Sequence, residues 1–217
     1  MAEVDVSVIV PVLNRADLVL GFWSRLHSHR SYELILVDNG SAEGTTRVLR
    51  LLQQRDEHVL VLRNNVNTGF GPASNQGAET ATGRVLLFTQ PDVIFSGDVI
   101  ERVSELSSDA LYGARLLTYD TGWNKFKSVI VQYLEGWLLA CTRSCWGVLG
   151  GFDPRYVPAD FEDIDLSYTA TSKGILLKQM DVPAKHPVMG QSAWTQFPDR
   201  AAVTVRNQAL FREKWGL

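Results

Sequence analysis

The sequence predicts an α/β domain built on a mostly parallel central sheet that helices flank. From Val6 to Thr89, apolar runs of strand length alternate with segments that repeat apolar residues at helical spacing. The apolar runs are continuous instead of alternating with polar residues, which is typical of strands covered on both faces. Each run ends in a loop rich in Asn, Asp, Gly and Pro. In open sheets of this kind ligands bind beyond the carboxyl ends of the strands, so these loops are the candidate site.

The first half of the chain alternates strand and helix. A β-branched run over 6–12 predicts the first strand, and Leu18, Phe22 and Leu26 at helical spacing predict a helix over 17–27. The other elements of this half are strands over 32–37, 58–62 and 84–89, and helices around 48–52 and over 72–81. The order β-α-β-α-β-α-β favours parallel strands joined by helices, as in a Rossmann-like nucleotide-binding half.

The second half is less regular. In chain order we expect a helix over 98–106, a polar loop over 119–127, strands over 128–134 and 135–142, helices over 143–149 and 161–172, a strand over 175–182 and a helix over 199–215. Gly150 and Gly151 end the short helix that begins at Arg143. No internal repeat, low-complexity tract or linker interrupts the sequence, so we expect a single domain over 1–217.

Composition excludes several classes of protein. The 217 residues are 45% hydrophobic and 21% charged, with 21 Lys+Arg against 24 Asp+Glu and a net charge of -3. Such a chain has enough apolar material for a core and lacks the overall basic field of a general nucleic-acid binder. No apolar run is long enough to span a bilayer, and the acidic N-terminus differs from a secretory signal, so we expect a cytoplasmic protein. Cys141 and Cys145 are expected to be reduced core thiols.

Two strand ends carry polar side chains that suit a nucleotide. Asp38 directly follows a buried strand, where its carboxylate would accept a hydrogen bond from an imide or a ribose hydroxyl, or else only cap the next turn. The loop from Asn67 through Gly69 to Gly71 precedes a helix that contains Asn75, so its backbone N–H groups could meet a phosphate. The loop lacks the full dinucleotide fingerprint and follows the third strand, which counts against a nicotinamide site.

Two further clusters suit a metal ion and proton transfer. Asp92, in Gln90-Pro91-Asp92, could hold a divalent cation such as Mg²⁺ or Mn²⁺, or lie in a solvated turn. Glu162, Asp163 and Asp165 occupy one helical first turn, where they either cap the helix or, by mutual repulsion, raise a carboxyl pKa towards that of a general base. His186 follows the next strand and is either a metal ligand or a structural residue.

Taken in order, these segments resemble the family 2 glycosyltransferases of the GT-A type, especially their rhamnosyltransferase-like bacterial members. The resemblance covers nearly the whole chain. The matching stretches are SVIVPVLNR (7–15), ELILVDNGS (33–41), NTGFGPASNQGAETATGRVLLFTQPDV (67–93), GWLLACTRSCWGVLGGFDPRY (136–156), FEDIDLSYTATSKG (161–174) and the loop around His186.

The resemblance implies a nucleoside-diphosphate sugar, either a UDP- or a dTDP-sugar, as donor. Residues 1–93 would form the donor-binding half and residues 94–217 the acceptor and catalytic half. Pro11, Asn14 and Asp38 would lie near the nucleoside, with Asp38 recognising the base. Asn67, Gly69 and Asn75 would lie near the base, ribose or diphosphate.

The resemblance also implies an inverting, metal-assisted transfer of the sugar. Asp163 would deprotonate the acceptor hydroxyl, and Glu162 would support or orient it. Asp92 and His186 would hold Mn²⁺ or Mg²⁺ at the diphosphate. Gln90 stands where the family's acidic motif has its first acid, which weakens the expected metal affinity.

Other functions remain open at this stage. A catalytically silent nucleotide-sugar-binding module is the alternative that Gln90 suggests, and a nicotinamide oxidoreductase is disfavoured by the missing fingerprint. The acceptor could be a polysaccharide, a lipid-linked sugar, a protein or a nucleic acid. Trp137 and Trp146 either line a sugar site or pack in the core. Basic residues of the C-terminal helix either contact an anionic acceptor or form a solvated face.

Overall fold

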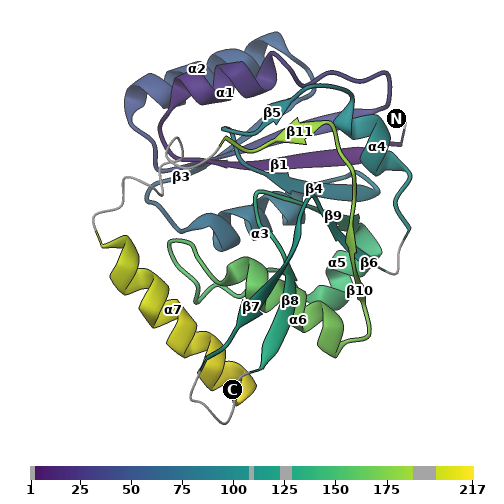
Figure 1. Cartoon of the computed structure of the whole chain (residues 1–217). Helices are drawn as coiled ribbons and strands as arrows, with labels where there is room; N and C mark the ends of the chain where they lie inside the picture. Colours follow the sequence, from purple (N-terminus) through teal and green to yellow (C-terminus); the bar gives the residue numbers. More distant parts are fainter. Residues whose placement is uncertain (1–2, 108–109, 123–128, 188–198) are drawn as a thin grey trace.

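A computed structural model describes residues 3–107, 110–122, 129–187 and 199–217 (Figure 1). Its first half contains β1 (Val6–Val12), α1 (Ala16–Trp23), β2 (Tyr32–Asn39), α2 (Glu43–Arg55), β3 (Val59–Asn64), α3 (Phe70–Thr80) and β4 (Val85–Thr89). The strands pair in parallel, β1 with β2 and β4, and β2 with β3. The predicted alternation of strand and helix in this half is confirmed.

The second half adds smaller elements and one antiparallel strand. Its elements are β5 (Ile94–Phe95), α4 (Val99–Ser104), β6 (Ala110–Gly113), β7 (Leu116–Asp120), β8 (Ile130–Leu134), β9 (Leu138–Thr142), α5 (Arg143–Leu149), α6 (Glu162–Ser172), β10 (Leu176–Gln179), β11 (Ala184–Lys185) and α7 (Arg200–Trp215). The central sheet has the order β10-β6-β9-β4-β1-β2-β3, and β9 runs antiparallel to β4 and β6. The predicted mostly parallel α/β sheet is therefore confirmed.

Short strands account for the differences from the sequence prediction. Tyr119 and Asp120 belong to β7, which pairs with β8, so the expectation of a polar loop is wrong for them, while residues 123–128 lie outside the described residues. The strands β5, β6 and β11 were not expected, since two to four residues give no recognisable periodicity.

The two faces of the sheet are both buried. Val6, Val8 and Val10 of β1 belong to the apolar cluster that α1, α2 and α4 cover, whereas Ile9 belongs to the cluster that α3, α5 and α6 cover. Successive strand residues point to opposite faces, so a sheet with helices on each side needs continuous apolar strands. Figure 1 shows α1 and α2 on one side of the sheet and α3 on the other.

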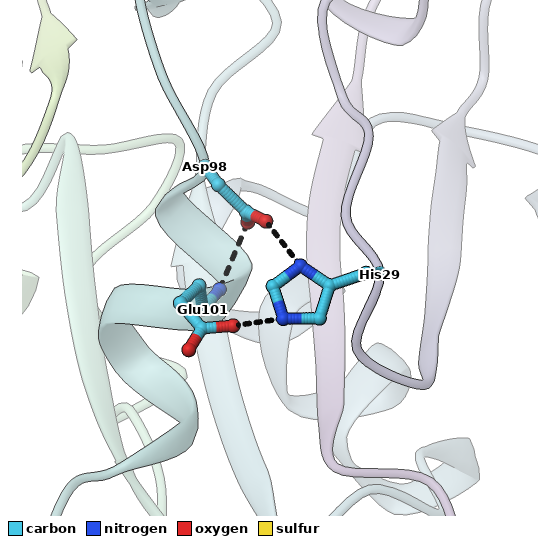
Figure 2. A group of neighbouring side chains, drawn as sticks. All are labelled: His29, Asp98 and Glu101. Atoms are coloured by element: carbon cyan, nitrogen blue, oxygen red, sulfur yellow. Dashed lines mark hydrogen bonds and ion pairs between the residues drawn. The ribbon is translucent and has the colours of Figure 1, made fainter.

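A small polar cluster fastens the loop after α1 to the start of α4 (Figure 2). His29 Nε2 lies 2.8 Å from Glu101 Oε2, and His29 Nδ1 lies 3.7 Å from Asp98 Oδ2. Arg30 Nε also donates to Glu101 Oε2 at 2.9 Å, and Asp98 caps α4 by accepting from the Glu101 backbone N–H. Glu101 and Asp98 are thus already occupied by protein donors, and we assign this cluster a structural role.

Two further expectations concern the cysteines and the membrane. Cys141 and Cys145 are free and buried, as expected. A hydrogen bond with Cys145, together with burial, raises the pKa of the Cys141 thiol well above its usual range. None of the helices within the described ranges is long and apolar enough to span a bilayer.

Close packing of α3 on the sheet depends on Gly77. A Cβ added there would lie 2.5 Å from Ile9 Cγ2 and 3.3 Å from Val37 Cγ2. By contrast, a Cβ on Gly44 of α2 would meet nothing within 4 Å. The glycine at 77 therefore sets the distance between α3 and the sheet.

We predict opposite effects of alanine at these two glycines. Gly77→Ala should lower the free energy of unfolding by about 1–3 kcal/mol, because the overpacked β-carbon must displace β1 or α3. Gly44→Ala should leave stability unchanged or raise it by up to about 1 kcal/mol through helix propensity. Urea unfolding followed by circular dichroism measures both, and a stabilised Gly77→Ala variant would contradict the packing argument.

Candidate active site

A large cleft opens at the carboxyl ends of the parallel strands, where the sequence predicted the site. Its volume is about 1280 Å³. Pro11 at the end of β1, Asn39 at the end of β2 and the loop 90–92 after β4 line it on one side. Tyr133 of β8, the segment 135–137 before β9, and the turn 158–164 before and into α6 line the other. The two halves of the chain thus share one cleft.

The cleft brings together most of the residues expected to carry the chemistry. The predicted site residues that line it are Pro11, Asn67, Asp92, Glu162, Asp163 and His186. The predicted site residues outside its lining are Asn14, Asp38, Gly69 and Asn75. These four residues instead form contacts, described below, that hold loops at the border of the cleft.

Glu162 and Asp163 begin α6 and line the cleft. Glu162 is buried at 7% exposure, whereas Asp163 is partly exposed. Asp163 Oδ2 accepts a hydrogen bond from the Gly136 N–H at 2.9 Å, and Oδ1 accepts from the Ile164 N–H at 2.8 Å. A Cβ on Gly136 would lie 3.1 Å from Asp163 Cβ, so a larger residue there would crowd the Asp163 side chain.

Burial shifts both carboxyl groups towards the protonated form. It raises the pKa of Asp163 to about 6, although the Gly136 and Ile164 hydrogen bonds act in the opposite direction. Burial, reinforced by the negative charge of Asp163, raises the pKa of Glu162 well above its usual range. Glu162 Oε2 has no hydrogen-bond partner within the described part of the chain. Asp163 is therefore the group of this pair that can exchange a proton near neutral pH.

A left-handed turn leads into these carboxylates. Asp160 and Phe161 have φ of 74° and 75°, a conformation that side-chain-bearing residues adopt at a cost of about 1–3 kcal/mol each. Phe161 is the residue directly before Glu162, so the turn sets the direction in which α6 begins. The sequence contained no signal for this turn, because neither residue is glycine.

Asp92 and His186 form a second polar pair in the cleft. The short β5 and β11 strands pair with each other, Lys185 opposite Ile94, and so carry the two residues to one place. His186 Nε2 lies 3.6 Å from Asp92 Oδ1. Both atoms are buried and lack a hydrogen-bond partner among residues that the structure describes. A carboxylate oxygen and an imidazole nitrogen that face one space fit a divalent metal ion.

Trp137 holds the imidazole in place. Its ring stacks on His186 with centroids 5.6 Å apart and an interplanar angle of 15°, and its indole N–H donates to Glu135 at 2.8 Å. Trp137 is buried in the core, one of the two expectations for it, and also borders the cleft, so its contact with a sugar stays a prediction. Trp146 packs instead on Phe88, with ring centroids 4.4 Å apart.

Asp38 is completely buried, and its carboxylate is occupied inside the protein. It accepts hydrogen bonds from the Ser41 N–H and Thr46 Oγ1, both at 2.9 Å, and from Arg63. These contacts correspond to the turn-capping alternative, and recognition of a base by Asp38 stays a prediction. The neighbouring Asn39 lines the cleft and donates to Asn67 Oδ1 at 2.8 Å.

Asn14 and Asn75 fasten loops that border the cleft. Asn14 Oδ1 accepts from the Ala42 N–H at 2.9 Å, which joins the loop after β1 to the start of α2. Asn75 pairs with the backbone of Phe152, donating to its carbonyl at 2.8 Å and accepting from its N–H at 2.9 Å.

Gly69 allows the start of α3 to pack closely on the turn before α6. Its φ is 94°, and a Cβ there would lie 2.8 Å from Val157 Cγ1. The next N–H, that of Phe70, donates to the Pro158 carbonyl at 2.8 Å.

Several residues that line the cleft were not singled out from the sequence. They are Arg15, Asn39, Arg115, Tyr133, Glu135, Asp160 and Thr204. Asn39 could have been found from its place at the strand end, but adjacent strand residues point to opposite faces and the sequence does not tell which faces a ligand. Thr204 lies on α7, a helix that the sequence predicted, and the others lie on turns or short strands that carry no periodic pattern.

Comparison with known proteins finds similar glycosyltransferases. The model of the family described as glycosyl transferase family 2 matches residues 7–144. Glycosyltransferase AglE of Haloferax volcanii is 31% identical over 125 residues, which make up 54% of this chain and 41% of AglE. The PGL/p-HBAD biosynthesis glycosyltransferase of Mycobacterium tuberculosis is 29% identical over 180 residues, or 75% of this chain and 69% of that protein.

Two solved structures share the fold. GalNAc-T7 with UDP, GalNAc and Mn²⁺ has a TM-score of 0.72 at 16% identity and covers 96% of this chain and 47% of that one. The mannosyltransferase PcManGT from Pyrobaculum calidifontis, in complex with GDP-Man and Mn²⁺, has a TM-score of 0.61 at 20% identity and covers 81% and 54%. The fold is that of GT-A type glycosyltransferases, and the match to the family model spans more than half of the sequence. This chain therefore belongs to glycosyl transferase family 2.

Proposed function

We propose that this protein transfers a sugar from a nucleoside-diphosphate sugar, a UDP- or dTDP-sugar, to an acceptor hydroxyl with inversion at the anomeric carbon. The observation that carries the proposal is the cleft itself. It contains Asp163, a carboxyl group whose pKa burial raises to about 6, together with the unpartnered pair Asp92 and His186. A base and a metal-binding pair are the two groups that such a displacement needs.

Asp163 is the proposed general base. Above pH 6 its ionised carboxylate accepts the proton of the acceptor hydroxyl while the hydroxyl oxygen attacks the anomeric carbon. The bond from that carbon to the diphosphate oxygen breaks on the opposite face, and the nucleoside diphosphate leaves with the bonding electrons. The backbone N–H groups of Gly136 and Ile164 hold the carboxylate in one orientation. Glu162, buried beside it, supports this geometry.

Asp92 and His186 are the proposed ligands of Mn²⁺ or Mg²⁺. When bound, the metal would neutralise the charge that develops on the departing diphosphate. Gln90 also lines the cleft, beside Asp92, so an amide stands where the family's motif has an acid. Both solved structures of this fold contain Mn²⁺, which supports the choice of metal.

The remaining predicted donor-binding residues divide into two groups. Pro11 and Asn67 line the cleft and would contact the nucleotide. Asn14, Asp38, Gly69 and Asn75 would act by holding the loops that form its walls. One of the two solved structures of this fold holds UDP and the other holds GDP-Man. Similarity of fold therefore does not determine which nucleotide base the donor carries.

The acceptor hydroxyl would enter next to Asp163, on the side that the β8–β9 segment forms. Arg115 pairs there with Glu135 at 3.1 Å, and burial raises the pKa of the neighbouring Tyr133. These groups suit a polyhydroxyl acceptor, because they offer both donors and acceptors of hydrogen bonds. Its class, whether polysaccharide, lipid-linked sugar, protein or nucleic acid, is a separate question.

We predict that a nucleotide sugar stabilises the protein in a metal-dependent way. A thermal-shift panel of UDP-glucose, UDP-galactose, dTDP-rhamnose and GDP-mannose, each with and without Mn²⁺, measures this, since a ligand that binds only the folded state raises its stability. Asp92→Asn should remove the effect of Mn²⁺, and the matched variant Asp98→Asn, in the structural cluster with His29 outside the cleft, should not. No stabilisation by any donor would refute the donor site.

Removal of the base should stop turnover without preventing binding. Asp163→Asn should lower kcat by about 10²- to 10⁴-fold, the usual contribution of a general base. Calorimetry should show UDP and Mn²⁺ binding with an affinity close to that of the unmodified protein. Unaltered turnover would exclude Asp163 as base, whereas an unmodified protein that binds a donor but never turns it over would favour a silent binding module.

The rate should follow the ionisation of Asp163. Only the deprotonated form accepts a proton, so kcat should rise with pH below about 6 and level off above it. Asp160→Asn removes a negative charge that raises the pKa of Asp163, and should move the midpoint to lower pH. A pH–rate profile of both proteins measures this, and a midpoint that moves upward in the variant would contradict the assignment.

A further inference from the structure

We infer that Asn207 of α7 is a positioning residue for the carboxylates of Glu162 and Asp163, because it holds the left-handed turn that precedes them. The inference rests on the proposed function for the role of Asp163, but the contacts on which it depends are independent of that function. Asn207 lies 44 positions beyond Asp163 in the chain, and nothing in the local sequence links the two.

Every polar atom of the Asn207 amide forms hydrogen bonds, and its nitrogen donates to two carbonyl groups of the turn. Asn207 is completely buried. Its Nδ2 donates to the Ala159 carbonyl at 2.9 Å and to the Asp160 carbonyl at 2.7 Å. Its Oδ1 accepts from Arg206 Nε at 3.1 Å and Nη2 at 2.8 Å. One side chain thus fixes two successive carbonyl groups at the point where the backbone is left-handed.

The turn needs such a support because its conformation is unfavourable for the residues that form it. Asp160 and Phe161 have consecutive positive φ angles, a region that favours glycine. If the two carbonyl groups were released, the backbone would relax towards negative φ, and the first residues of α6 would rotate with it. Glu162 follows immediately, so its carboxylate and that of Asp163 would change direction in the cleft.

Other contacts of α7 reinforce the same turn. Thr204 Oγ1 donates to Asp160 Oδ2 at 2.5 Å, and Arg206 Nη2 donates to the Val157 carbonyl. Phe211 packs on Phe161 with ring centroids 6.0 Å apart. Side chains over about two turns of α7, from Thr204 to Phe211, therefore contact the segment that leads into α6.

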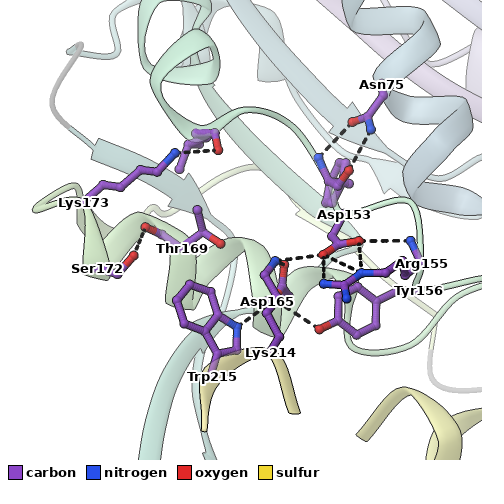
Figure 3. Close-up of polar contacts among 12 residues, drawn as sticks. Asn75, Asp153, Arg155, Tyr156, Asp165, Thr169, Ser172, Lys173, Lys214 and Trp215 are labelled. Atoms are coloured by element: carbon purple, nitrogen blue, oxygen red, sulfur yellow. Dashed lines mark hydrogen bonds and ion pairs between the residues drawn. The ribbon is translucent and has the colours of Figure 1, made fainter. Parts of the chain in front are cut away.

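The C-terminal end of α7 is fastened to α6 itself (Figure 3). Lys214 Nζ and Trp215 Nε1 donate to the buried carboxylate of Asp165, at 2.7 Å and 2.8 Å. Tyr156 also donates to Asp165, at 3.1 Å, and Lys214 reaches Asp153 at 2.9 Å. Because Asp165 lies two residues after Asp163 on α6, α7 contacts the catalytic segment on both sides of the carboxylate pair.

The test compares Asn207→Asp with the control Ser7→Ala. Asn207→Asp keeps the side-chain volume and the acceptor for Arg206 but has no hydrogen atoms to donate to the turn. Ser7 is equally buried and also bonds twice, to Glu33 at 2.6 Å and from the Gly83 N–H at 2.8 Å, but at the amino end of the sheet. The control therefore measures the effect of lost buried hydrogen bonds away from the cleft.

Three readouts separate positioning from stability, at a temperature where both variants are folded. The assay follows release of nucleoside diphosphate from each of the four donors of the thermal-shift panel. For Asn207→Asp, kcat should fall about tenfold or more, because a misplaced Asp163 carboxylate loses its catalytic advantage. KM for the donor and UDP–Mn²⁺ binding should be unchanged. The midpoint of the pH–rate profile should move, whereas Ser7→Ala should leave kcat and the midpoint as they are.

Glycine at position 160 provides a rescue. Glycine adopts positive φ without penalty, so Asn207→Ala should lower kcat less in an Asp160→Gly background than in the unmodified protein. This double-mutant comparison also covers the case in which Asn207→Asp does not fold. Equal losses in both backgrounds, or a kcat for Asn207→Asp no lower than that of Ser7→Ala, would overturn the inference.

Amide hydrogen exchange tests the role of Asn207 separately from the proposed function. Asn207→Asp should accelerate exchange over residues 160–165, and Ser7→Ala should not. If the unmodified protein turns over none of the four donors, the proposed function fails for them, while exchange still tests whether Asn207 holds the turn. Unchanged exchange over this segment would show that it does not.

Discussion

The burial of two adjacent carboxyl groups is the constraint on which the architecture of the cleft depends. Ionised carboxylates are costly to remove from water unless they are hydrogen-bonded or protonated. Glu162 and Asp163 meet this constraint through the positive end of the α6 dipole, through backbone N–H donors and through raised pKa values. Each of these depends on a backbone path that only tertiary contacts can hold.

The mixed sheet supplies one of those contacts from a distant part of the chain. The antiparallel strand β9 inserts between β4 and β6, and the segment that enters it contains Gly136. That glycine brings a backbone N–H to Asp163, and the next residue, Trp137, stacks on His186. The segment that leads into β9 therefore contacts both the proposed base, Asp163, and the proposed metal ligand, His186.

How much could be predicted from the sequence differs between the two halves. The β-α alternation up to β4 was predicted because β1, β2 and β4 are apolar and buried on both faces. The short strands β5 to β7 and the residues that define the turn before α6 carried no such signal. The convergence of Asp92 and His186 was expected only from the family resemblance, since the two lie far apart in the chain and meet through a pairing of two-residue strands.

Individual site residues show why pattern alone was insufficient. Asp38 and Asn39 are adjacent and both form internal hydrogen bonds, yet of the two only Asn39 lines the cleft. The basic residues of α7 had been weighed as an acceptor surface, but Lys214 is paired with Asp153 and Asp165. Such assignments depend on partners that are remote in sequence.

The place of β9 also governs how this chain can be divided. All five residues of β4 are buried, and β4 is hydrogen-bonded to β1 on one edge and to β9 on the other. A fragment truncated after residue 93 would retain every predicted donor-side strand but would expose β4 as a long, apolar, unpaired edge, the kind of surface that recruits other chains. The proposed donor-binding half therefore depends on β9 to cover this edge, and a chimera that joins it to the second half of another protein must preserve a strand in the position of β9.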